Sequence, residues 1–459
     1  MRQAGLIGAL IGSVLLVACT GDGSITEERS RSTDPEKPPN VLIIVTDDQR
    51  LDTMSALPQT RRLFGQRGTR FSHAYITTPQ CCPSRASIMT GQYSHNHGVL
   101  ENNDGGRIKQ RTTLQARLQG AGYLTALSGK YLQGRPVSEN PPFFDRWATV
   151  GWGYYHRNFN VDGVMTPVAD YSTDFIADTA ISYLEDFERD DDRPWYVYVA
   201  PNAPHLPYTA ARAYRRAKVE QLRSNPALRE SDLDDKPPYF SNPLLIEKTG
   251  YTYRQGRVVF RRQMRTLLSV DDLVGDLFAK LDQLDESRDT LAFFISDNGH
   301  LLGEHGLFGK RLPYEASIQV PLYMTWPGRV PEGTTDDRLA AGIDLAPTIL
   351  QAAGIDAEKP PMDGKSLLAD DPRDMVLLEQ YKNGHIPDWV SLLTRGSQYV
   401  EYENRRTGER LYREFYDLKE DRWQVENLLR SGGQRARKRA ARAARTLRAI
   451  VDCSGNECP

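Results

Sequence analysis

A cysteine at the predicted start of a helix is the residue best placed for unusual chemistry in this sequence. Cys81 opens the run CCPSR, and the proline and small residues that follow predict a helix over Ser84–Met89. The backbone N–H groups and the dipole at such a helix start favour an anion. Arg85 adds a fixed charge and a donor fork that suits oxyanions. The alternative is a buried cysteine pair in a turn before a structural helix.

Four oxygen-bearing side chains follow two predicted strands at the points where those strands end. Asp47 and Asp48 follow one apolar strand, and Asp297 and Asn298 follow another. An all-oxygen set fits Ca²⁺ or Mg²⁺ better than Zn²⁺, because no thiolate or imidazole ligand is required. For the two adjacent aspartates alone, the alternative is an ordinary turn after a strand.

Two further predicted strands also end in polar groups. Lys130 follows the strand Tyr123–Leu127, while Asn202 and His205 follow the strand Trp195–Val199. Ligands of open α/β sheets bind outside the carboxyl ends of the strands, so polar groups at four strand ends predict one shared site. A lone lysine or histidine is otherwise more often a surface or structural residue.

The elements that carry these residues alternate short apolar strands with helices, which is typical of an α/β sheet. The run Val41–Thr46 is apolar, as expected of a strand that is buried on both faces. The other predicted strands are Arg70–Tyr75, Tyr123–Leu127, Trp195–Val199, Leu291–Ser296 and Val320–Trp326. The other predicted helices are Leu57–Arg67, Leu114–Ala121, Phe175–Glu188, Val258–Leu284 and Ile343–Ala353.

The C-terminal part of the chain has a different pattern. Three strands are predicted there, over Met375–Glu379, Val390–Arg395 and Ser397–Glu403, and an Arg/Ala-rich helix is predicted over Gln434–Val451. We therefore expect a main domain over residues 40–365 and a C-terminal subdomain with a tail over residues 366–459. The arginine face of the last helix is expected to be solvated, and binding of acidic lipid or a sulfated polymer is the alternative.

The N-terminus is typical of an exported protein. Arg2 precedes the apolar stretch Leu6–Ala18, which is too short to span a bilayer comfortably. The sequence LVAC that ends at Cys19 resembles a bacterial lipobox, so we expect a signal peptide over residues 1–18 and a lipid on Cys19. Residues 19–39 are then a flexible tether. The alternative is an ordinary signal peptide or an uncleaved anchor.

Cysteine content and charge limit the function further. Of the five cysteines, Cys453 and Cys458 are close enough to close a small disulfide loop, which is plausible outside the cytoplasm. Cys82 is expected to be a buried free thiol. The net charge of −2 gives no indication of nucleic-acid binding.

The run CCPSRASIMTGQYSHNHGV, which begins at Cys81, resembles the signature of type I sulfatases. Together with GKYL it is most similar to the subgroup that contains N-acetylglucosamine-6-sulfatase and the extracellular heparan sulfatases. The resemblance implies an alkaline-phosphatase-like α/β fold, with a large mixed sheet flanked by helices and a smaller C-terminal antiparallel-sheet subdomain. It also implies that a formylglycine-generating enzyme converts Cys81 to Cα-formylglycine, whose hydrated aldehyde is the nucleophile.

The same resemblance implies roles for other positions. Lys130 and Lys310 match lysines that bind sulfate, and His205 matches a histidine proposed to protonate the leaving oxygen. The positions that match the family's cation ligands, usually of Ca²⁺, are Asp47, Asp48, Cys81, Asp297 and Asn298. Leu132 stands where many members have a histidine, so the base that releases sulfate must lie elsewhere. The candidates for that base, or for substrate binding, are His95, His97, His300 and His305.

These observations predict an exported, lipid-anchored sulfuric ester hydrolase that acts on a sulfate monoester of a sugar. Its cofactor would be one divalent cation, Ca²⁺ or Mg²⁺. One alternative is a formylglycine-dependent phosphonate monoester or phosphodiester hydrolase, which would use the same nucleophile and metal. The non-enzymatic alternative is an inactive lipoprotein that binds sulfated glycans.

Overall fold

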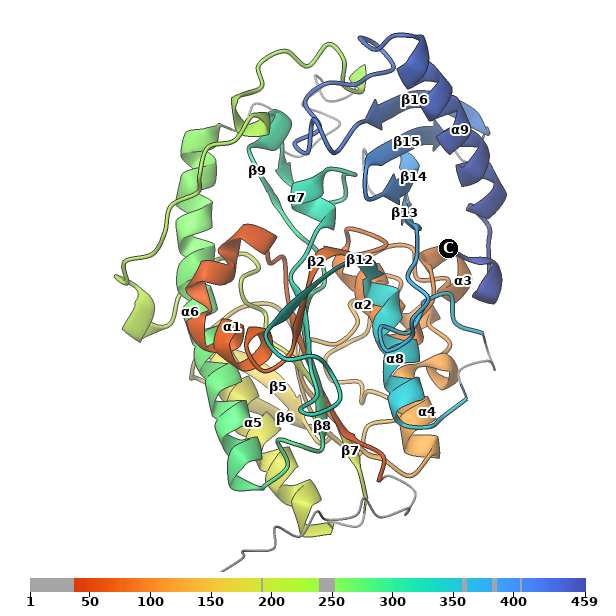
Figure 1. Cartoon of the computed structure of the whole chain (residues 1–459). Coiled ribbons are helices and arrows are strands. Elements are labelled where there is room, and N and C mark those ends of the chain that lie inside the picture. Colours follow the sequence, from red (N-terminus) through yellow and green to blue (C-terminus); the bar gives the residue numbers. More distant parts are fainter. Residues whose placement is uncertain (1–36, 191–192, 239–251, 357–360, 382–385, 405–406) are drawn as a thin grey trace, which may run out of the picture. The chain divides into compact units, whose positions relative to one another are not determined.

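The central element of the structure is a ten-stranded mixed β-sheet (Figure 1). The computed structural model describes residues 37–190, 193–238, 252–356, 361–381, 386–404 and 407–459. Across the sheet the strands are β12 (Thr334–Ala341), β2 (Thr69–Tyr75), β11 (Leu322–Thr325), β8 (Thr290–Ser296), β1 (Asn40–Thr46), β7 (Trp195–Ala200), β3 (Leu124–Gly129), β4 (Arg146–Val150), β5 (Arg157–Val161) and β6 (Val164–Val168).

The strand β1 lies at the centre of this sheet and runs parallel to both of its neighbours, β7 and β8. Its side chains alternate between two hydrophobic clusters: Val41, Ile43 and Val45 belong to one, and Leu42 and Ile44 belong to the other. Both faces are therefore covered, which explains why the strand is apolar throughout. Parallel strands also send their carboxyl ends to one edge, where the polar residues follow.

Helices cover both faces of the sheet (Figure 1). On one face lie α2 (Cys81–Thr90), α4 (Leu114–Gly120) and α8 (Leu345–Ala352), and on the other lie α1 (Pro58–Gly65), α5 (Ser172–Phe187) and α6 (Tyr253–Gln283). There are also two short helices: α3 (Ser94–His97) comes directly after α2, and α7 (Glu315–Ile318) comes directly before β11. The long helix α6 begins earlier than predicted because Thr252 and Gln255 form a capping box ahead of a polar first turn.

A four-stranded antiparallel sheet forms the C-terminal part. Its strands, in order, are β13 (Met375–Gln380), β14 (Asp388–Thr394), β15 (Ser397–Asn404) and β16 (Glu409–Tyr416). The helix α9 (Gln434–Ile450) buries Ala440, Ala444 and Leu447, and these side chains join the same hydrophobic cluster as Val41 of the large sheet. The predicted fold class is confirmed, while the boundary at residue 365 stays a prediction.

Several strands at the edges of the large sheet were not predicted. The strands β5 and β6 form a hairpin whose turn, Asp162-Gly163, has φ angles of 47° and 92°. Asp-Gly is a typical sequence for such a turn, but the flanking strands are short and partly exposed and lack a clear apolar alternation. The edge strand β12 was missed for a similar reason, because its first half is polar and largely exposed.

The predicted signal peptide, the lipid attachment at Cys19 and nearly all of the predicted tether lie outside the described residues. Within the part of the chain that the structure describes, no helix combines the length and apolar character needed to cross a membrane.

Candidate active site

Four strand ends and one helix start meet at the carboxyl edge of the large sheet. The residues brought together there are Asp47 and Asp48 after β1, Lys130 after β3, His205 after β7, Asp297 and Asn298 after β8, and Cys81 and Arg85 of α2. Backbone hydrogen bonds fix these ends, since the Asp47 N–H donates to the Ala203 carbonyl (3.2 Å) and the Lys130 N–H to the Ala200 carbonyl (2.8 Å). These side chains are all buried, with His205 the most exposed of them at 8%, and Lys310, which also reaches the cluster, is partly buried.

Cys81 occupies the first position of α2 and is fully buried. Its Sγ lies 3.2 Å from Asp47 Oδ1, 3.7 Å from Asp48 Oδ1 and 2.6 Å from Lys310 Nζ. Ligand atoms of Cys81, Asp47, Asp48 and His205 all lie within 4.8 Å of one another. The structure therefore places residue 81 in direct contact with the predicted metal ligands and with a predicted sulfate-binding lysine.

The oxygen atoms around residue 81 fit a hard cation. The Oδ1 atom of Asn298 is buried and has no hydrogen-bond partner among the described residues, while its Nδ2 donates to Asp48 Oδ1 at 2.7 Å. A buried carbonyl oxygen without a partner is costly, and a bound cation would satisfy it. Asp297 is oriented differently, because its Oδ2 accepts from Arg85 Nε at 2.8 Å and its Oδ1 from the Asp48 N–H at 3.1 Å.

Three cationic side chains balance the three carboxylates. The ion pairs are Lys130 with Asp47, Lys310 with Asp48, and Arg85 with Asp297. Arg85 is fully buried, and its second contact is a hydrogen bond from Nη1 to the Lys130 carbonyl at 3.1 Å. A buried guanidinium is tolerated only with such partners, so Arg85 both holds Asp297 in place and brings positive charge to the helix start.

These charges determine the protonation states at the centre. Burial raises the pKa of the Asp47 carboxyl, but the nearby cations, Lys130 foremost, outweigh burial and hold the pKa well below its usual value. Burial, together with Asp297 and Asp47, raises the pKa of the Cys81 thiol well above its usual value. A thiol in this setting stays protonated and is a weak nucleophile. The position therefore suits chemistry other than that of a thiolate.

Two of the candidate histidines, His205 and His300, lie at the cluster. His205 Nδ1 lies 2.9 Å from the Leu206 carbonyl, so it is assigned the proton, and Nε2 lies 3.6 Å from Asp48 Oδ2. His300 Nδ1 lies 2.9 Å from the Leu301 carbonyl. Burial lowers the pKa of His300 to about 4, which keeps this imidazole neutral. Both rings are thus held by a neighbouring carbonyl with Nε2 left available.

Two other candidate histidines have partners away from the cluster. His305 forms a close ion pair with Glu230. His97 Nε2 lies 3.0 Å from Ser87 Oγ, and burial lowers its pKa to about 3. Leu132 is buried and apolar, so it supplies no base. Each of these two rings therefore has a partner outside the cluster, whereas His300 lies at the cluster and stays a candidate for the base.

His95 connects α3 to the C-terminal end of the chain. Its Nδ1 lies 2.8 Å from Glu379 Oε2, and its Nε2 lies 2.8 Å from the Cys453 carbonyl. Cys453 forms a disulfide with Cys458. Burial lowers the pKa of His95, but the hydrogen bond and charge of Glu379 raise it overall to about 9. A protonated His95 therefore links α3 to Glu379 of β13 and to the backbone at Cys453.

Replacement of His95 is expected to destabilise the protein in a pH-dependent way. A raised pKa in the folded state contributes stability that is fully present below the unfolded pKa of about 6.5 and is lost as pH rises through about 9. We expect His95→Gln to lower the free energy of unfolding by about 1–3 kcal/mol at pH 6, and by less above pH 9. Urea unfolding of both proteins at the two pH values measures this difference. A loss of unfolding free energy that does not depend on pH would contradict a charged His95–Glu379 pair.

Three residues near the site were not found by sequence reasoning. Arg50 is buried and donates from Nη1 to the His300 carbonyl at 2.6 Å, and Asn102 accepts from the Cys82 N–H at 3.0 Å. Trp152 is 54% exposed, and its ring centroid lies 5.4 Å from that of His205. Arg50 directly follows the Asp47-Asp48-Gln49 segment, so its position after β1 is a signal that could have indicated it, while nothing in the local pattern around Trp152 indicates its place.

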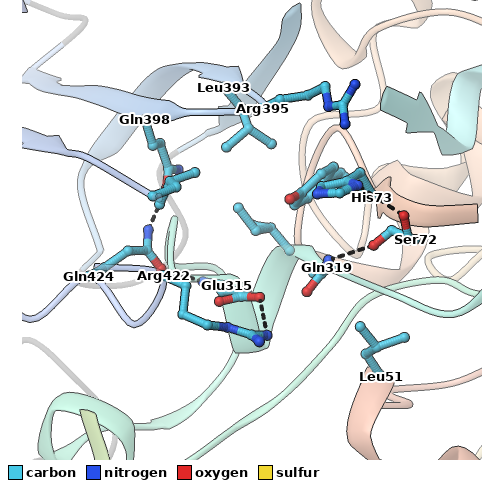
Figure 2. A pocket seen from close by; sticks show the side chains of 13 residues that line it. Leu51, Ser72, His73, Glu315, Gln319, Leu393, Arg395, Gln398, Arg422 and Gln424 are labelled. Carbon is cyan, nitrogen blue, oxygen red and sulfur yellow. Dashed lines mark hydrogen bonds and ion pairs between the residues drawn. The ribbon is translucent and has the colours of Figure 1, made fainter. Parts of the chain in front are cut away.

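A separate cavity of ≈ 310 Å³ lies between β2, α7 and the small sheet (Figure 2). Its wall includes His73, Gln319 and Arg422, and Arg422 pairs with Glu315 at 3.1 Å. None of the predicted site residues lines this cavity. The candidate active site is therefore the buried cluster around residue 81.

The sequence matches the family described as Sulfatase over residues 39–355. This chain belongs to the sulfatase family of hydrolases. A second match, to the family described as N-sulphoglucosamine sulphohydrolase, C-terminal, covers residues 303–443 and so includes the small sheet. The resemblance that the CCPSR run carried is confirmed.

Curated sulfatases are similar to this one over most of its length. The human N-acetylglucosamine-6-sulfatase is 36% identical over 358 residues, which cover 72% of this chain and 64% of the human protein. The putative extracellular sulfatase Sulf-1 homolog of Caenorhabditis elegans is 32% identical over 76% of this chain and 50% of the worm protein. The sulfatase described here thus spans between half and two thirds of these relatives.

Solved structures share the fold of this sulfatase. One, described as being in complex with its substrate D-glucosamine-2-N,6-O-disulfate, has a TM-score of 0.79 and 24% identity, and the match covers 90% of this chain and 97% of that one. The phosphonate monoester hydrolase of Agrobacterium radiobacter has a TM-score of 0.71 and 20% identity over 91% and 96% of the two chains. At sequence identities of 24% and 20%, the structural similarity establishes a shared fold.

Proposed function

We propose that this sulfatase hydrolyses sulfate monoesters of sugars, with Cα-formylglycine at position 81 as the reacting group. The observation that carries the proposal is the place of Cys81, which is buried at a helix start in contact with Asp47, Asp48 and Lys310. Relatives whose names specify N-acetylglucosamine 6-sulfate support the sugar class of substrate. Hydrated, the aldehyde would supply the oxygen nucleophile that a protonated thiol cannot.

The oxygen cluster would hold one divalent cation, Ca²⁺ or Mg²⁺. Asp47 and Asp48 each offer a carboxylate, and Asn298 offers an Oδ1 atom with no hydrogen-bond partner in the described chain. Asp297 would complete the set, and Arg85 would hold its carboxylate in place through Oδ2. When bound, such an ion supplies Lewis-acid stabilisation of the sulfate oxygens.

The remaining side chains have separate tasks on the substrate. Lys130 and Lys310 bring two ammonium groups to the cluster and would bind the sulfate oxygens. The Nε2 atom of His205 faces the cluster from the end of β7, beside Asp48, and in the doubly protonated ring its N–H would donate a proton to the leaving oxygen. His300 also lies near Asp48 and Lys310, but its ring is neutral with the proton on Nδ1, so its unprotonated Nε2 would fit the base that releases sulfate rather than the acid.

Loss of the general acid is expected to depend on the leaving group. Proton donation contributes about 10²–10⁴-fold, and an activated aryl sulfate needs little of it. We therefore expect His205→Ala to slow hydrolysis of a sugar sulfate far more than that of 4-nitrophenyl sulfate. Lys130→Ala should slow both, because sulfate binding is common to the two esters. Equal slowing of both esters by His205→Ala would instead make His205 a binding or structural residue.

A comparison of three esters tests the proposed activity. The wild-type protein, supplied with Ca²⁺, is expected to release sulfate from N-acetylglucosamine 6-sulfate faster than it releases phosphonate from a phosphonate monoester. The reverse preference would favour the phosphonate hydrolases that share the fold. Turnover of no ester, 4-nitrophenyl sulfate included, would support the inactive glycan-binding alternative.

Export and lipid attachment at Cys19 are also part of the proposal. They are supported by the apolar stretch and the LVAC sequence at the N-terminus. Relatives from C. elegans and Drosophila melanogaster are named as extracellular sulfatases. A sugar sulfate outside the cell would then meet the enzyme at the membrane surface.

A further inference from the structure

A cavity of ≈ 260 Å³ opens directly beside the catalytic cluster. Lys130 is common to both, since it lines this cavity and its ammonium group pairs with Asp47 at the centre. Trp152 also lines the cavity, and its ring contacts that of His205, with centroids 5.4 Å apart. The cavity therefore lies next to both the lysine proposed to bind sulfate and the histidine proposed to protonate the leaving oxygen.

The first observation that points to a ligand is the exposure of Trp152. Its side chain is 54% exposed, the most for any tryptophan in the described part of the chain. An exposed indole beside polar groups is suited to the apolar face of a sugar ring, because it offers a large rigid surface without losing a hydrogen bond. The tilt of 60° between its ring and that of His205 shows that the two rings are not stacked on each other.

The second, independent observation is a pair of polar atoms that lack partners. Thr149 of β4 is 5% exposed, and its Oγ1 has no hydrogen-bond partner among the described residues. The Oε1 atom of Gln133 is buried and equally unpaired within the described chain. Both residues line the cavity. Buried hydroxyl and carbonyl groups are costly when unpaired, and hydroxyl groups of a ligand would satisfy them.

We propose that this cavity binds the sugar ring that carries the sulfate ester. The ring would stack on Trp152 and hydrogen-bond to Thr149 and Gln133, while the sulfate reaches past Lys130 to residue 81. Arg135 and Glu139, which pair with each other in the wall, offer a donor and an acceptor for further ring substituents. The inference rests on the proposed function and adds the place where the sugar ring binds and the residues that hold it.

Binding to an inactive form tests the inference without turnover. In a Cys81→Ala background with Ca²⁺ present, calorimetry would compare N-acetylglucosamine 6-sulfate with inorganic sulfate, which has no ring. We expect Trp152→Ala to weaken binding of the sugar sulfate about tenfold and to leave inorganic sulfate unchanged. Thr149→Val, which keeps the shape but removes the hydroxyl, is expected to weaken the sugar sulfate about three- to tenfold.

Leu411→Ala is the matched control, because Leu411 is 42% exposed and lies on β16 of the small sheet. It should change neither affinity. Unchanged binding of the sugar sulfate in both Trp152→Ala and Thr149→Val, or equal weakening of both ligands, would overturn the inference while leaving the proposed function standing. Absence of binding by either ligand to the Cys81→Ala protein would overturn the proposed function and the inference with it.

In the active protein the same variants should raise KM for the sugar sulfate. Trp152→Phe keeps an aromatic surface and is expected to recover most of the loss seen with Trp152→Ala. A fall in kcat with no change in KM would mean that Trp152 only positions His205, and this result would also overturn the sugar-binding role.

Discussion

Replacement of Cys81 by alanine is expected to abolish turnover of every sulfate ester while the fold survives. The side chain at position 81 is small and fully buried, and it contacts Asp47, Asp48 and Lys310 rather than the hydrophobic core. Loss of a nucleophile that acts with its neighbours as a unit costs about 10⁴-fold or more in rate. Hydrolysis of 4-nitrophenyl sulfate is the measurement, because its good leaving group makes it the substrate least dependent on other residues.

The neighbouring thiol provides a matched control. Cys82 is also buried at the start of α2, but its Sγ lies 3.4 Å from the Gln133 carbonyl, whereas that of Cys81 contacts Asp47 and Asp48. We expect Cys82→Ala to keep activity within a few-fold and to lose about 1 kcal/mol of stability as a small cavity forms. If Cys81→Ala retained wild-type turnover while remaining folded, residue 81 would not be the nucleophile.

Removal of Asp297 is expected to have the second-largest effect, on metal content and stability together. Asp297 faces the oxygen cluster and is also the partner of Arg85, whose side chain is 0% exposed. Asp297→Ala would leave this guanidinium buried without its carboxylate, which typically costs about 3–5 kcal/mol. The variant should also contain no stoichiometric Ca²⁺ or Mg²⁺ by elemental analysis, and its activity should be lost.

Asn298→Ala separates the two effects. It removes the unpaired Oδ1 atom from the cluster without leaving a buried charge alone. We expect at least about tenfold weaker binding of the cation with little loss of thermal stability. Full metal content in both variants would contradict a cation site at this edge of the sheet.

The polar residues of the site could be predicted from the sequence because strand ends are easily recognised. The strands β1, β7 and β8 are apolar throughout, and parallel strands place their carboxyl ends together, so the residues that follow them had to meet. Cys81 was found for a different reason, since the proline two residues later predicts a helix start. Local patterns were sufficient to place these residues, while the chemistry of Cys81 follows only from the family resemblance.

Other features depend on contacts between distant segments and have no local signal. Nothing in the sequence around His95 indicates that it reaches Glu379 and the Cys453 carbonyl, which lie 284 and 358 residues away. The position of Trp152 against His205 likewise depends on how the loop after β4 packs on the loop after β7. Such contacts are set by tertiary packing, which single-sequence periodicity does not contain.

The chemical state of residue 81 is the central claim, and mass spectrometry of the peptide that contains it tests that claim most directly. The protein should be purified from its native host, digested after alkylation, and compared with Cys82 in the same peptide as an internal reference. We predict that residue 81 has the mass of an aldehyde in place of its –CH₂SH group, while Cys82 is alkylated as an ordinary thiol. Alkylated cysteine alone at position 81 in protein that turns over sulfate esters would contradict the account.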